Sequence, residues 1–144
     1  MANKKEALPW GWIINIGVIT KILLPITAFI WVFIYSFLIN PGQTEAFYQA
    51  YAQTASSYVS IITGIPIFFF FAWWMGRRTG RRVMASAVLI WLIYVALDLP
   101  LLLFFDFSDV WIPTIIAHAT KLLGAYLGAL LAIKQSSESS PATA

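Results

Sequence analysis

The sequence contains no cysteine, a single histidine and few charged residues. Without cysteine, neither a disulfide framework nor a thiolate metal site can form. One histidine cannot supply both axial ligands of a haem within one chain. Charged residues make up 10% of the 144 residues, against about 25% in soluble domains. We therefore expect neither a metal nor a cofactor, and the low charge argues against a soluble protein.

What the sequence does have is apolar length. Hydrophobic residues make up 60% of the chain, which is more than so small a soluble domain could bury. The sequence predicts an all-α integral membrane protein, with the lipid bilayer as its main partner. We expect one domain over 1–134, an up-down bundle of four transmembrane helices, and a disordered cytoplasmic tail over 135–144. The predicted spans are 10–39, 59–75, 83–105 and 110–133.

The segment 43–58 differs from the spans because it mixes serine, threonine and glutamine with aromatic residues. Thr44 is a suitable N-cap, and Glu45 is favourable in a first helical turn. We expect an interfacial helix that leads into the second span, with its aromatic side chains at the headgroup level. Pro66 should kink the second span, since proline removes one helical hydrogen bond.

The basic residues lie near the two ends of the chain and in the central turn 76–82. This distribution suits contact with anionic lipid headgroups, and we expect no nucleic-acid partner. The other two predicted connections contain no lysine or arginine. The positive-inside rule therefore places both termini and the central turn in the cytoplasm, with the chain in the inner (plasma) membrane. The central residues that would set this topology and contact headgroups are Arg77, Arg78, Arg81 and Arg82.

Four ionisable residues fall inside the predicted spans, where they are costly and mark candidate functional sites. They are Lys21, Asp98, His118 and Lys121. The third and fourth spans are joined by so short a link that they must be antiparallel neighbours. Counted outward from that link, Asp98 falls beside His118, and Tyr94 lies level with Lys121. The sequence thus predicts a buried polar cluster in which Asp98 reaches His118 or Lys121.

This cluster has a structural and a functional interpretation. In the structural one, Asp98 neutralises Lys121, and the polar contacts fix the register of the hairpin. In the functional one, the cluster is a proton or ion relay, or a site for a small anionic or polar ligand. We favour the structural interpretation. Lys21 is an additional candidate, but its side chain leans toward the cytoplasmic end of its helix, so we expect it to snorkel outward.

Gly124 and Gly128 form a GxxxG pattern, which is typical of close helix packing in membranes. Counted from the same link, Trp91 lies level with Gly124. One interpretation is that Gly124 makes room for the Trp91 ring within the chain. The other is that the two glycines form a dimer face.

No enzyme signature is present in the sequence. There is no P-loop, no HExxH motif and no nucleophile level with His118. We therefore expect a non-enzymatic membrane protein that acts through helix packing, as an accessory subunit or a small homo-oligomer. The alternative is a small transporter or proton-linked channel that uses Asp98, His118 and Lys121. A quinone- or haem-binding anchor is a third, weaker hypothesis.

Overall fold

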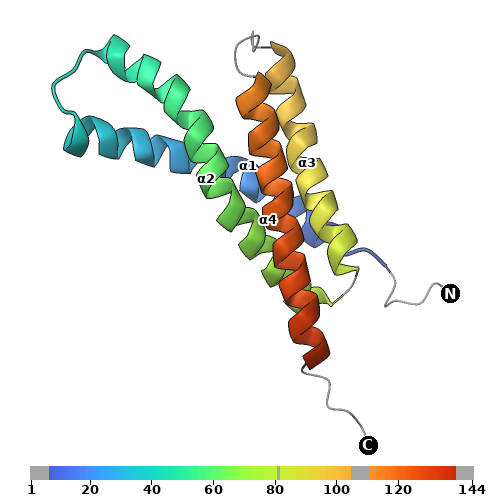
Figure 1. Cartoon of the computed structure of the whole chain (residues 1–144). Coiled ribbons are helices and arrows are strands. Elements are labelled where there is room, and N and C mark those ends of the chain that lie inside the picture. Colours follow the sequence, from blue (N-terminus) through green and yellow to red (C-terminus); the bar gives the residue numbers. More distant parts are fainter. Residues whose placement is uncertain (1–6, 81, 105–110, 139–144) are drawn as a thin grey trace, which may run out of the picture.

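The computed structural model describes residues 7–80, 82–104 and 111–138 (Figure 1). These residues form four long α-helices and one short π-helical segment. In chain order they are α1 (Trp10–Ile34), η1 (Tyr35–Ile39), α2 (Glu45–Thr79), α3 (Val83–Phe104) and α4 (Trp111–Glu138). Each of the four helical stretches is long and apolar enough to cross a bilayer. The predicted all-α, four-helix membrane bundle is therefore confirmed.

The first helical stretch is longer than a bilayer requires. Together α1 and η1 span 30 residues, which is roughly 45 Å of helix against a hydrocarbon core of about 30 Å. In Figure 1, α1 runs obliquely behind α3 and α4, whereas those two helices lie side by side. Gly17 allows this crossing, because a Cβ there would lie 2.6 Å from Ile93 Cγ2 on α3. This close approach brings the middle of α1 against α3.

The predicted interfacial segment and the second span form one continuous helix. α2 runs for 35 residues from its N-cap Thr44, whose side chain accepts a hydrogen bond from the Phe47 amide at 3.3 Å. The predicted cap is thus confirmed. In Figure 1, the first turns of α2 and the end of α1 project away from α3 and α4 as a hairpin. We call this part, residues 29–52, the distal arm.

Aromatic contacts hold the distal arm together. The rings of Tyr35 and Tyr51 stack with their centroids 3.7 Å apart. Trp31 Nε1 donates a hydrogen bond of 3.0 Å to Tyr51 Oη. Tyr48 Oη donates one of 2.7 Å to the carbonyl of Asn40, which closes the loop between the two helices. The two sides of the arm are therefore joined by specific contacts and not only by their connecting loop.

The two glycines of the GxxxG pattern pack α4 against α2. A Cβ at Gly124 would lie 2.5 Å from the Ile65 carbonyl oxygen, and one at Gly128 would contact the backbone of Phe69. The interpretation that Gly124 makes room for Trp91 is therefore wrong, because Gly124 packs against the backbone of Ile65 on α2 and not against the Trp91 ring on α3. The pattern also serves packing within the chain, which removes it as an argument for a dimer face.

The basic end of the bundle is capped by tryptophans. The Arg77 guanidinium lies 5.6 Å from the Trp73 ring centroid, and that of Arg78 lies 5.3 Å from the Trp74 centroid. Gly80 ends α2 in the left-handed region at φ 57°. α4 continues to Glu138, past its predicted end at 133. Arg81, the acidic link 106–109 and residues 139–144 of the predicted tail lie outside the described residues.

Candidate ligand-binding site

A pocket of about 500 Å³ lies among the four helices, at the level of the ionisable residues. Its size falls within the range of about 300–1,000 Å³ usual for small-molecule sites. All four helices contribute polar side chains to its wall. These are Lys21 from α1, Ser56, Ser57 and Ser60 from α2, Tyr94 and Asp98 from α3, and Thr114, His118 and Lys121 from α4.

Asp98 is the anionic centre of the pocket. One carboxylate oxygen, Oδ1, forms an ion pair with Lys21 Nζ, and the other, Oδ2, lies 3.2 Å from His118 Nε2. The contact between Asp98 and His118 confirms the register predicted for the α3–α4 hairpin. The expectation that Lys21 snorkels outward is wrong. Because α1 crosses close to α3, the nearest anion to the Lys21 ammonium is the Asp98 carboxylate rather than a lipid headgroup.

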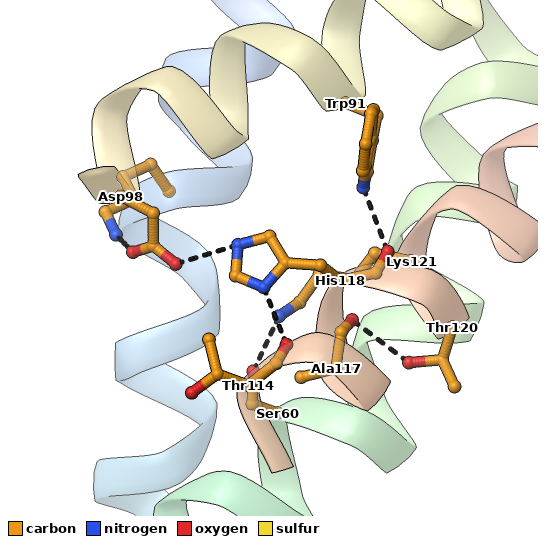
Figure 2. A network of polar contacts seen from close by, with 9 residues as sticks. Ser60, Trp91, Asp98, Thr114, Ala117, His118, Thr120 and Lys121 are labelled. Carbon is orange, nitrogen blue, oxygen red and sulfur yellow. Dashed lines mark hydrogen bonds and ion pairs between the residues drawn. The ribbon is translucent and has the colours of Figure 1, made fainter. Parts of the chain in front are cut away.

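His118 is held between two oxygen atoms (Figure 2). Its Nδ1 lies 2.8 Å from the carbonyl oxygen of Thr114, one turn earlier on α4. A carbonyl can only accept, so the proton of this hydrogen bond belongs to Nδ1. A neutral ring in this tautomer presents a lone pair at Nε2 to the Asp98 carboxylate, without hydrogen-bond alignment. The His118 ring therefore connects α4 with the Asp98 carboxylate on α3 through a close polar contact.

Lys121 is the most deeply buried charge in the described part of the chain, with 1% of its surface exposed. Its Nζ donates a hydrogen bond of 2.8 Å to Ser60 Oγ on α2. No carboxylate among the described residues lies within 4.0 Å of that nitrogen. The interpretation in which Asp98 neutralises Lys121 is therefore corrected, since Asp98 pairs with Lys21 and His118 instead.

Tyr94 lies close to both lysines. Its ring centroid is 4.9 Å from Lys121 Nζ and 5.3 Å from Lys21 Nζ, which is within the range of a cation–π contact for each ammonium group. Such contacts stabilise a desolvated cation by about 2 kcal/mol. The Phe68 ring packs edge-on against Tyr94 at 5.3 Å and holds it in place. The predicted proximity of Tyr94 and Lys121 is confirmed.

Two residues that contact Lys121 have no counterpart in the sequence prediction. Ser60 accepts the hydrogen bond from Lys121, and Gly64 makes room for the aliphatic stem of that lysine, since a Cβ there would lie 2.8 Å from Lys121 Cγ. They stand one helical turn apart on α2, in the small-xxx-small spacing typical of close membrane-helix packing. This spacing is the feature of the sequence from which a close helix contact at Ser60 and Gly64 could have been predicted. Trp91, predicted to face Gly124, instead donates a hydrogen bond of 2.9 Å to the His118 carbonyl.

The pocket carries more positive than negative charge. Two lysines, Lys21 and Lys121, face a single carboxylate, that of Asp98, among the residues that line it. No known protein family, curated protein or solved structure matches the chain. The chemistry of the pocket is therefore what bears on function, and a cationic surplus of this kind attracts an anion.

Proposed function

We propose that this small polytopic membrane protein binds a small anion in the pocket among its four helices and acts as a transporter, without covalent chemistry. The observation that carries the proposal is the Lys121 ammonium, which is 1% exposed, lines the pocket and has a neutral serine as its hydrogen-bond acceptor. A buried charge of this kind is usually functional when it lies within a membrane helix.

The energetics of Lys121 support an anionic ligand. Removing an ammonium group from water costs several kcal/mol when no counter-charge is near. The Ser60 hydroxyl returns about 1.5–3 kcal/mol, and the Tyr94 ring about 2 kcal/mol. Neither of these contacts neutralises the charge. A carboxylate or phosphate group in the pocket would do so, and would also have Lys21 nearby, since Lys21 lines the same pocket and its Nζ lies 5.3 Å from the Tyr94 ring centroid.

The contacts of Asp98 also support an anion site. The Asp98 carboxylate pairs with Lys21 and lies beside His118, so the Lys121 ammonium has no carboxylate among the described residues within 4.0 Å. This favours the transporter hypothesis over a purely structural cluster, in which the side chains would neutralise one another completely.

The full-length protein in lipid nanodiscs provides the test. Binding of acetate and of inorganic phosphate is measured by calorimetry for the wild type, for Lys121→Met and for the control Lys134→Met at the exposed end of α4. We expect Lys121→Met to weaken binding at least tenfold, which corresponds to about 1.4 kcal/mol, and Lys134→Met to leave it unchanged. A wild type that binds neither anion, or a Lys121→Met variant that binds as well as the wild type, would contradict the proposal.

Assembly through helix packing, as a small homo-oligomer or an accessory subunit, is the second candidate. It is favoured by α1, which buries few side chains and exposes large apolar ones such as Phe29 at 73% and Ile22 at 58%. Native mass spectrometry from a mild detergent distinguishes the two. A dimer that dissociates on Ile22→Arg would support assembly through α1, whereas a monomer that binds anions would leave these residues to lipid.

A further inference from the structure

A second pocket, of about 330 Å³, adjoins the first. It lies between α1 and α2, mostly within the distal arm. Ala28 and Ser56, just outside the arm, line both pockets. Most of its surface comes from the apolar or aromatic parts of side chains. Its remaining lining residues are Phe29, Val32, Glu45, Tyr48, Gln49 and Ala52.

The boundary between these two pockets is formed by small side chains. Ala28 from α1 and Ser56 from α2 have short side chains, so little separates the first pocket, which contains Lys121 and is called the polar pocket below, from the second, apolar pocket. A third pocket, of about 370 Å³, lies on the α3–α4 side and shares Thr114 and His118 with the polar pocket. The His118 ring lies between the first and third pockets, where its contacts with Asp98 and the Thr114 carbonyl hold it in place. A ligand bound in the first pocket can therefore extend more easily into the second pocket, toward the distal arm, than into the third.

We propose that the ligand is an anionic amphiphile. Its carboxylate or phosphate head contacts Lys121 in the polar pocket, and its unbranched apolar chain lies in the second pocket along α1 and α2. This inference rests on the proposed anion site and adds the substrate class. Lys121 and Ser60 supply the polar recognition, and the side chains of Ala28, Val32 and Ala52 supply the apolar surface.

The test compares acetate with hexanoate, which carry the same head group and differ only in chain length. Both are titrated into the full-length protein in nanodiscs. Burying one methylene group contributes up to about fourfold in affinity. We expect hexanoate to bind the wild type at least about tenfold more tightly than acetate. Ala52→Phe, which fills the second pocket at a residue that does not line the first, should remove this advantage and leave acetate binding intact.

Ala119→Phe is the matched control, because Ala119 lines the third pocket and not the second. It should keep the full preference for hexanoate. Val32→Phe, from the α1 wall of the second pocket, repeats the test if Ala52→Phe does not fold. Retention of the full preference in the second-pocket variants would overturn the inference, and so would its loss in Ala119→Phe.

The two proposals fail in different ways. If neither acetate nor hexanoate binds the wild type, the anion site itself is wrong, and the amphiphile inference falls with it. If acetate binds and hexanoate binds no more tightly, the anion site stands and the inference about the apolar chain is wrong.

Discussion

Replacing Asp98 by asparagine removes the single carboxylate that the described residues place in the polar pocket. Lys21 then loses its ion-pair partner, and His118 loses the negative charge beside Nε2. Leaving one member of a buried ion pair without its partner costs about 3–5 kcal/mol. The Lys21 and Asp98 side chains are 20% and 17% exposed, so water screens part of this loss. We therefore expect Asp98→Asn to destabilise the protein by about 1–3 kcal/mol.

A pair of double-mutant cycles identifies which lysine is the partner. Adding Lys21→Met to Asp98→Asn removes the unpaired charge, so the double variant should recover part of the loss, with a coupling energy of about 1–2 kcal/mol. Adding Lys121→Met should give a coupling below about 0.5 kcal/mol, since Lys121 contacts Ser60 and not the carboxylate. Unfolding followed by circular dichroism in detergent gives the free energies. A larger coupling for Lys121 than for Lys21, or simple additivity in both cycles, would refute this account of the cluster.

Two further predictions concern packing and topology. Gly128→Ala should destabilise the bundle by about 2 kcal/mol or more, because the added Cβ meets the α2 backbone, which cannot move aside as a side chain can. Gly11→Ala is the control, because a Cβ there has nothing within 4 Å, and it should change the unfolding free energy by less than about 1 kcal/mol. Equal effects of the two substitutions would contradict the packing argument. A topology reporter inserted at Thr79 should read cytoplasmic and one at Gln43 should read outside; a periplasmic signal at Thr79 would reverse the proposed orientation.

The fold was predictable because the bilayer imposes simple requirements on a sequence. A spanning helix needs about 20 apolar residues, and the sequence contains four runs of nearly that length or more. The register of α3 against α4 was predictable for a related reason. A short link leaves two antiparallel helices little freedom to slide, so counting from the link placed Asp98 beside His118 correctly.

What could not be predicted depends on how separate hairpins pack. Lys21 was expected to snorkel because its own helix offers it no partner, and the partner that it has lies on α3, 77 residues later. That contact exists because Gly17 lets α1 approach α3, which no pattern within α1 specifies. Gly124 was assigned to Trp91 for a similar reason, since the prediction considered one hairpin and the actual neighbour is α2. Ser60 is one of several serines on α2, and its role emerges only with Lys121 opposite.

The central claim is that Lys121 binds an anion, and side-chain NMR of lysine tests it most directly. In full-length protein labelled at lysine and held in nanodiscs, acetate is titrated while the ammonium resonances of Lys121 and Lys134 are followed. The account predicts a saturable shift of the Lys121 resonance, with no such change for Lys134 at the exposed end of α4. A Lys121 resonance that does not respond, or that responds linearly and equally with Lys134, would contradict the account.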